Sequence, residues 1–312
     1  MRDETSADAE TPEPVRASRE GSAPGASVPL ALVRALRPHQ WSKNVLLFLA
    51  PLAAHRLESQ VLLRAALAFA AFCLAASSAY VLNDLLDVER DRAHPTKCRR
   101  PFAARDLPEA AGWVLAPALL ASAAAVGASL GVAFIGLLLL YYAVTTAYSL
   151  KLKSIAMLDV IVLAGLYTVR LFSGAVAVDV PVSSWLLSFA MFLFLSLAMV
   201  KRTSELRKHG PSSNGRGYVA VDEPQLAALG SAAGYVAVLV LALYVNGDHV
   251  RTLYAHPERL WLVCPLVLYW IGRVWLLANR GLVHDDPVVF ALRDRVSWAV
   301  GALAGGVFLF AS

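Results

Sequence analysis

The sequence predicts an all-α membrane protein with nine transmembrane helices. Of its 312 residues, 58% are hydrophobic and only 16% are charged, whereas a soluble domain carries about 25% charged residues. The apolar residues are gathered in long stretches, most of them near the roughly 20 residues that a helix needs to cross a bilayer. Lysine and arginine are concentrated in alternate connections between these stretches. The three observations together indicate an integral membrane protein.

The nine expected spans follow one another from residue 43 to the end of the chain. The first is short and contains Pro51, a residue that disfavours a helix interior. The others are rich in Leu, Ala and Val, with small residues that permit close helix packing. We expect the spans at residues 43–56, 61–86, 109–127, 130–149, 155–177, 183–202, 224–246, 258–279 and 291–311.

The first 28 residues have a different composition. They are rich in Glu, Ala, Ser, Pro and Gly, which cannot bury a core, so we expect residues 1–28 to be a disordered tail. No apolar stretch lies near Met1, so we expect no cleavable signal peptide. The three cysteines, Cys73, Cys98 and Cys264, have no metal-binding spacing and form no disulfide framework.

The basic residues predict the orientation of the chain in a cell (inner) membrane. Positive charge marks the cytoplasmic side, so we expect the N-terminus in the cytoplasm and, after nine spans, the C-terminus outside. The net charge of +5 then favours lipid headgroups and an anionic substrate over nucleic acid. The basic connections hold Arg90, Arg92, Lys97, Arg99, Arg100 and Arg105; Lys151 and Lys153; Lys201, Arg202, Arg207, Lys208 and Arg216; and Arg280, Arg293 and Arg295.

An acidic box directly follows the second span. It contains Asn83, Asp84, Asp87 and Asp91, and the i, i+3, i+7 spacing predicts that the three aspartates share one helical face. Carboxylates are costly near hydrocarbon, so such a cluster is a functional-site candidate. Carboxylate oxygens suit Mg²⁺, which binds through one or two carboxylates, substrate phosphates and water. We therefore predict Asp84, Asp87 and Asp91 as metal ligands and catalytic residues.

The basic loop after the box contains Lys97 and Arg100. Acidic residues followed by basic ones suit a metal-bound polyphosphate, because Lys and Arg bind phosphate oxygens. The other interpretation of this loop is a solvated cytoplasmic segment whose charges only set the orientation.

Four further polar groups are expected on the same side. Tyr148, Lys151, Lys153, Asp159 and Arg170 either line a polar chamber or form structural pairs, since an unpaired Arg at that depth costs about 2.5–3.5 kcal/mol. We predict Asp159 as a further catalytic residue and the other four as substrate-binding residues. Lys201 and Arg202 bind substrate or complement a helix dipole. Lys43 and Asn44 reach a substrate headgroup or anchor the membrane edge beside Trp41, an expected interfacial anchor. The segment with His284, Asp285 and Asp286 is interpreted as a structural loop.

The nine helices and the Asn-Asp-x-x-Asp-x-x-x-Asp box resemble the UbiA superfamily of intramembrane prenyltransferases over about residues 33–311. The resemblance implies one transmembrane transferase domain, residues 29–312, with a central cavity that opens to the cytoplasmic side and to lipid. It also implies isoprenoid transfer with Mg²⁺. The family's second Asp-rich box on the fifth helix is represented here by Asp159 alone.

The branch of decaprenyl-phosphate phosphoribosyltransferases is more similar still. The shared motifs are Arg37-Pro-His-Gln-Trp-Ser-Lys-Asn44, Tyr148-Ser-Leu-Lys-Leu-Lys153, Asp159 and the stretch from Arg170 to Gly174. This resemblance implies that 5-phosphoribose passes from phosphoribosyl diphosphate, a phosphorylated sugar donor, to a polyprenyl phosphate lipid, with release of diphosphate. The acidic box would then bind the donor, and Lys151, Lys153 and Arg170 the lipid phosphate.

Two other functions remain open at this point. One is a prenyltransferase that moves a polyprenyl group from its diphosphate to an aromatic or other small acceptor. The second is a transporter with an acidic cation site, which matching broken helices in two halves would favour; the sequence has no such pair. No oligomeric state is predicted.

Overall fold

The computed structural model describes residues 27–181, 183–209, 216–247, 250, 254–283 and 286–311, and within these ranges the secondary structure is helical. Nearly all of the predicted tail, and His284 and Asp285 of the predicted loop, lie outside the described residues. At the edge of the tail, the chain already forms helix α1 (Val28–Leu36), which the sequence did not indicate.

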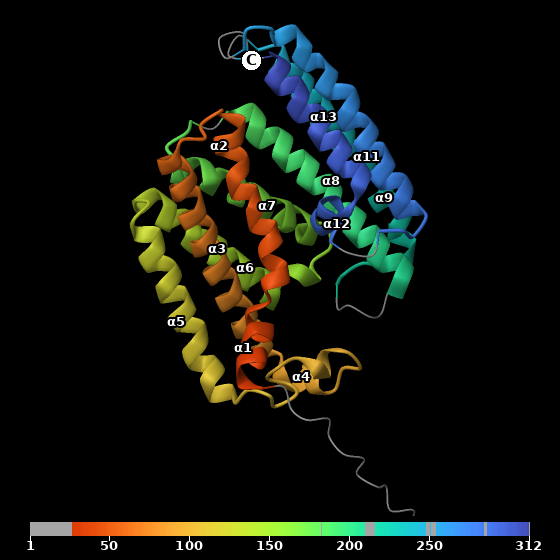
Figure 1. The fold of residues 1–312 in the computed structure, drawn as a ribbon. Helices are drawn as coiled ribbons and strands as arrows, with labels where there is room; N and C mark the ends of the chain where they lie inside the picture. Colours follow the sequence, from red (N-terminus) through yellow and green to blue (C-terminus); the bar gives the residue numbers. More distant parts are fainter. Residues whose placement is uncertain are drawn as a thin grey trace, which may run out of the picture.

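The remaining helices include counterparts of most of the predicted spans, together with short helices that were not predicted. They are η1, a 3₁₀ helix (Pro38–Phe48), α2 (Leu49–Ala53), α3 (Ser59–Leu86), α4 (Val88–Arg92), η2 (Lys97–Arg99), α5 (Glu109–Ala128), α6 (Val132–Leu150), η3 (Leu152–Ser154), α7 (Leu158–Ala177), α8 (Ser184–His209), η4 (Ala220–Asp222), α9 (Glu223–Val245), η5 (Pro257–Leu262), α11 (Val263–Asn279), α12 (Pro287–Arg293) and α13 (Arg295–Ala311). Figure 1 shows α7 and α8 between a group formed by α2, α3, α5 and α6 and a group formed by α9, α11 and α13.

Seven helices in the described part of the chain are long and apolar enough to cross a membrane, and an eighth span is possible if α12 and α13, which meet at 81°, are counted as one. The prediction of nine spans is therefore not confirmed. The first expected span, residues 43–56, consists of η1 and the five-residue α2. Pro51 lies within α2, and His55 just beyond it takes a left-handed φ of 55°, so a long α-helix does not form.

The 3₁₀ winding of η1 decides which of its side chains face the bundle. Residues three apart lie on one edge of a 3₁₀ helix, and Trp41, Asn44 and Leu47 have this spacing. Asn44 and Leu47 are buried, and the Trp41 indole donates to Ser77 Oγ on α3 at 3.0 Å. Trp41 thus bonds to the bundle, a role that the expected interfacial anchor did not anticipate.

Glycine lets η1 approach α7 at backbone distance. A Cβ added at Gly174 would lie 2.1 Å from the carbonyl oxygen of Leu47, so only glycine fits this crossing. The contact places η1 beside the α7 residues that bear charge. Buried alanines of α3 (Ala65, Ala68, Ala71 and Ala75) belong to the same apolar core as Leu47, and such small residues permit the close packing that is typical of membrane helices.

Candidate active site

The acidic box lies where α3 ends and α4 begins. Asp84 and Asp91 are buried, and both accept hydrogen bonds from one nitrogen, Nη1 of Arg100, at 3.1 and 2.6 Å. Arg37, from the start of η1, donates to both Asp84 oxygens at 2.7 and 3.0 Å. Asp87 occupies the break between the helices and pairs with Arg90 at 3.2 Å. The three aspartates therefore do not lie on one continuous helix, and only Asp84 and Asp91 share a cationic partner.

The donor chemistry of this box suits Mg²⁺. Among the described residues, no group of three or more His, Cys, Asp or Glu side chains is arranged as a metal cage. Mg²⁺ does not require one, because it usually keeps water and binds through one or two carboxylates and substrate phosphates. The contact of a single Arg100 nitrogen with both Asp84 and Asp91 shows that these carboxylates can share one cation.

The predicted cations divide into two groups in space. Burial lowers the pKa of the Lys153 ammonium, and the nearby Asp87 carboxylate opposes the shift, so Lys153 lies beside the acidic box. Lys97 and Lys151 are exposed, and Asn83 is half-buried. The expectation that Lys151, Lys153 and Arg170 act together is not met, because Arg170 belongs to a different set of contacts.

A buried ion pair ties α6, α7 and α8 together. Asp159 is 0% exposed and accepts bonds from Arg202 Nε and Nη2 (the latter at 2.9 Å) and from the Tyr148 hydroxyl at 2.7 Å. Arg202 Nη2 also donates to the Tyr148 oxygen at 2.8 Å, and its Nη1 to Glu205. The donors of Arg202 and the oxygens of Asp159 are thus bonded within the network, which suits a role in positioning these helices.

Arg170 has neutral partners only. It is 6% exposed, and it donates to the Asn44 amide oxygen at 2.9 Å, the Leu166 carbonyl at 2.7 Å and the Tyr141 hydroxyl at 2.8 Å. Its guanidinium also lies over the Tyr141 ring, 4.7 Å from the centroid. Within the described ranges no carboxylate pairs with it, so Arg170 contributes an uncompensated positive charge to the interior.

Asp286 was not identified from the sequence as a site residue. Its carboxylate accepts from Lys43 and Lys201, each at 3.1 Å, and from the Tyr167 hydroxyl at 2.9 and 3.0 Å. Burial raises the pKa of this carboxyl, but the Lys201 and Lys43 ammonium groups lower it more, so that it lies well below its usual range. The one sequence signal was an Asp directly before Pro287, which predicts a helix N-cap, and the Asp286 side chain does cap α12.

The two polar clusters adjoin one another around Tyr80. The phenol of this residue lies within electrostatic range of Arg170, Arg37 and Asp286, and the Arg37 guanidinium lies 5.2 Å from the centre of its ring. The acidic box, with its arginines, and the Asp286 cluster, with its lysines, are therefore neighbouring parts of one polar region.

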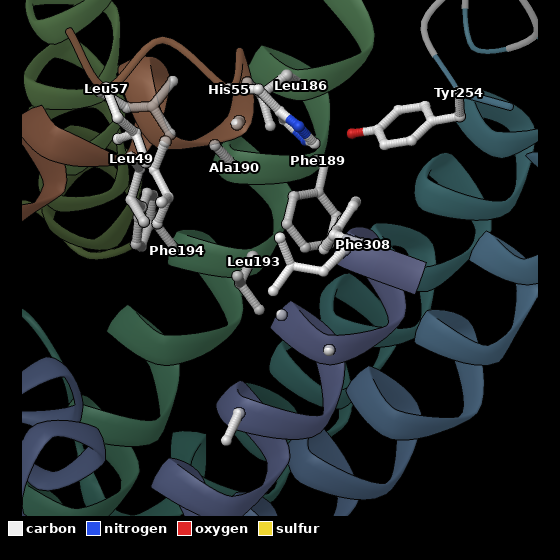
Figure 2. Close-up of a pocket in the computed structure, with 17 residues that line it drawn as sticks. Leu49, His55, Leu57, Leu186, Phe189, Ala190, Leu193, Phe194, Tyr254 and Phe308 are labelled. Atoms are coloured by element: carbon white, nitrogen blue, oxygen red, sulfur yellow. The ribbon is translucent and has the colours of Figure 1, made fainter. Parts of the chain in front are cut away.

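An apolar cavity of about 840 Å³ lies between α2, α8 and α13. Figure 2 shows Phe189, Leu193 and Phe308 directed into the space between α8 and α13, with His55 and Tyr254 at one end. Phe194, which lines this cavity, stacks on the ring of Tyr167 with centroids 5.2 Å apart. This stacked pair of rings links the apolar cavity, which Phe194 lines, to the Asp286 cluster, to which Tyr167 belongs. The expected opening of a cavity to the cytoplasmic side is not confirmed by this arrangement.

Comparison with known sequences identifies one family and several relatives. A family model described as the UbiA prenyltransferase family matches residues 44–292. The chain is 37% identical to nodulation protein NoeC of Azorhizobium caulinodans, over 88% of this chain and 92% of that protein. It is 39% identical to the uncharacterized protein y4nM of Sinorhizobium fredii over 88% of its own length, but it spans only 55% of that protein.

Other matches cover a smaller part of the chain or share only the fold. Identity to the decaprenyl-phosphate phosphoribosyltransferase of Mycolicibacterium smegmatis is 41%, over 56% of this chain and 57% of that protein. The structure of a UbiA homolog from Archaeoglobus fulgidus bound to GPP and Mg²⁺ aligns with a TM-score of 0.66 at 16% identity, over 90% of this chain and 98% of that one. The similarity to the Archaeoglobus fulgidus protein is therefore a similarity of fold.

Proposed function

The chain belongs to the UbiA prenyltransferase family, a family of membrane-embedded transferases, and on that premise we propose that it moves 5-phosphoribose from phosphoribosyl diphosphate to a polyprenyl phosphate and releases diphosphate. The observation that carries this proposal is the second polar cluster, which is built from cations. Lys43 and Lys201 hold the single carboxylate of Asp286. The Arg170 guanidinium lies 5.5 Å from the centre of the Tyr167 ring, whose hydroxyl donates to the same carboxylate. Such a cluster suits an anionic acceptor, whereas a second metal-bound diphosphate would need more carboxylates.

The acidic box is the proposed donor site. Asp84, Asp87 and Asp91 would hold Mg²⁺ on the diphosphate of the sugar donor, and the bound ion would stabilise the charge of the leaving group. Arg37 and Arg100 already lie among these carboxylates, and their planar guanidinium groups suit phosphate oxygens. Lys97 and Lys153, on the loops beside the box, and Asn83 would complete the contacts to the donor.

The Asp286 cluster is the proposed acceptor site. Lys43, Lys201 and Arg170 would hold the lipid phosphate, and the apolar cavity behind Phe194 and Tyr167 would receive the first isoprene units. A polyprenyl phosphate has a phosphate head and an apolar chain. The head would suit the cationic cluster, and the chain would suit the neighbouring apolar cavity. Asp159 and Arg202 would act through Tyr148 by fixing the helices rather than by touching substrate.

The reaction needs no dedicated general base. An oxygen of the ionised lipid phosphate attacks the anomeric carbon of the ribose, and the bond from that carbon to the diphosphate oxygen breaks, with the electron pair leaving on the diphosphate. The lysines hold the nucleophile, and the arginines hold the leaving group. Positioning and charge stabilisation would supply most of the acceleration.

The orientation in the membrane is also proposed. The acidic box, η3, the end of α8 and Asp286 belong to one polar region, and the predicted positive-inside pattern would place that region in the cytoplasm, where a water-soluble sugar phosphate is available. We propose the cell membrane as the location, with the N-terminus in the cytoplasm and the C-terminus outside.

Two labelled donors test the function. Purified chain in detergent with Mg²⁺ is incubated with labelled phosphoribosyl diphosphate and a polyprenyl phosphate or, in parallel, with a labelled prenyl diphosphate and an aromatic acid. We expect label in the lipid extract from the first mixture alone. Prenylation of the aromatic acid, with phosphoribosyl diphosphate left intact, would refute the proposal in favour of prenyl transfer.

A matched pair of lysine variants tests the acceptor site. Lys201→Met removes one contact to Asp286, whereas Lys208→Met alters an exposed lysine further along the same helix. We expect the first variant to raise the KM for the lipid phosphate at least tenfold and the second to behave as wild type. Equal KM values would remove Lys201 from the acceptor site.

A further inference from the structure

We propose that the Asp286 carboxylate occupies the subsite of the acceptor phosphate and that a phosphate monoester enters by displacing it, so that Asp286 excludes acceptors without a dianionic head. This inference rests on the proposed function, because it concerns the same acceptor site. In this proposal α12 moves when the acceptor binds, a movement that the transfer reaction does not itself require.

The contacts of Asp286 are those of a bound anion. Its Oδ2 atom alone receives Lys43 at 3.1 Å, Lys201 at 3.1 Å and the Tyr167 hydroxyl at 3.0 Å. These three donors come from η1, α8 and α7, so the carboxylate occupies a site that three separate helices form. One terminal oxygen of a phosphate has the same size and charge preference as this carboxylate oxygen.

The balance of charge favours a ligand with more charge than a carboxylate. Lys43, Lys201 and Arg170 bring three positive charges to the region, against the single negative charge of Asp286. A phosphate monoester carries about −1.5 to −2 at pH 7, so it compensates this cluster better than Asp286 does. A neutral alcohol or phenol would leave both lysines without a counter-charge when Asp286 moved away, and buried charges without partners are strongly disfavoured.

The segment that carries Asp286 is built to move as a short unit. Asp286 caps α12, a helix of seven residues, and the axis turns by 81° between α12 and α13. Asp294, at that turn, pairs with Arg273 at 2.7 and 3.0 Å and stays outside the acceptor cluster. A displacement of Asp286 can therefore be absorbed by α12 while the pair at the turn persists.

Ligand binding by the full-length chain in detergent tests this inference without donor or metal. The probes are farnesyl phosphate, farnesol as its neutral counterpart, and inorganic phosphate as the head alone. The variants are Asp286→Asn and, as the matched control on the same segment, Asp294→Asn. We expect Asp286→Asn to bind farnesyl phosphate about tenfold more tightly than wild type, and we expect both farnesol and inorganic phosphate to bind more weakly than farnesyl phosphate in either chain. Asp294→Asn should bind as wild type does.

Hydrogen exchange in the wild-type chain gives a second readout that does not depend on the variant folding. Farnesyl phosphate should speed the exchange of α12 amides such as that of Phe290, which bonds to the Asp286 carbonyl, and farnesol should not. Unchanged or weaker binding of farnesyl phosphate by a folded Asp286→Asn variant, or slower α12 exchange with the ligand, would overturn the inference. If binding behaves as expected but no phosphoribosyl transfer occurs, the proposed donor fails and the displacement of Asp286 stands.

Discussion

Replacing Asp159 by Asn separates a structural from a catalytic role of this residue. The substitution keeps the shape but removes the charge that faces Arg202, while the two side chains are 0% and 1% exposed. Removing one partner of a buried ion pair costs about 3–5 kcal/mol. Because Glu205 still holds Arg202, we expect a loss near the lower bound, about 3 kcal/mol, which corresponds to a fall of roughly 6–12 °C in Tm.

The assay is a thermal melt of the purified variant in detergent, with turnover measured below the melting range. Glu58→Gln serves as the control, because Glu58 lies 3.8 Å from Arg56 in an ion pair whose side chains are 62% and 46% exposed, and such pairs contribute only about 0–1 kcal/mol. The double variant Asp159→Asn/Arg202→Met should lose less stability than the two single losses added together, by about 1–3 kcal/mol. A variant that melts within about 1 °C of wild type yet has lost its turnover would show that Asp159 acts on substrate, against the reasoning above.

Three further substitutions have sharp expectations. Asp87→Asn should leave Tm unchanged, because Asp87 is partly exposed and its ion-pair partner, Arg90, is 84% exposed. It should lower turnover about 100-fold and raise the Mg²⁺ concentration required; turnover close to wild type would remove Asp87 from the metal site. Gly174→Ala places a methyl group 2.1 Å from the Leu47 carbonyl oxygen and should lower the free energy of unfolding by about 1–3 kcal/mol. Gly165→Ala, on the same helix, meets open space and should leave the stability unchanged. Equal Tm values for the two variants would contradict the close crossing. Arg170→Lys keeps the charge but loses the planar fork and with it buried hydrogen bonds to Asn44 and Tyr141, so Tm should fall. Steady-state kinetics below the melting range should show a higher KM for the lipid phosphate or a lower kcat, and kinetics like those of wild type would exclude Arg170 from the acceptor site.

The spans and the acidic box could be predicted because each has a strong local signal. Apolar stretches of bilayer length place α3, α5, α6, α7 and α9 within three residues of their observed bounds, since a helix in lipid must satisfy its backbone within itself. In contrast, α8 extends to His209, beyond the expected end at 202, and the span expected at 258–279 is divided into η5 and α11. Aspartates such as Asp84 directly after such a stretch are conspicuous because hydrocarbon penalises them. Arg170 was flagged for the same reason, and it is buried with hydrogen bonds to η1 and α6, so the choice between a chamber-lining and a structural role stays a prediction.

The rest depends on which segments meet in three dimensions. Asp286 is an ordinary N-cap in the sequence, and its importance arises only because α12 brings it against Lys43 and Lys201. Lys153 was grouped with Arg170 from their common charge, but the turn after α6 places Lys153 beside Asp87. The first span was mistaken for an α-helix because hydropathy does not distinguish α from 3₁₀ winding.

Eleven residues of 3₁₀ helix reach further than the same eleven residues of α-helix. At about 2.0 Å per residue, η1 is about 22 Å long, whereas α winding would give about 17 Å. Arg37 and Lys43, six positions apart, hold Asp84 and Asp286 respectively, so the winding between them spaces the two polar clusters about 12 Å apart along η1 rather than about 9 Å. In the proposed reaction, the backbone of η1 would help to set the distance between donor and acceptor. An insertion in η1, or a change of its winding, would alter that distance without replacing any residue of the two clusters.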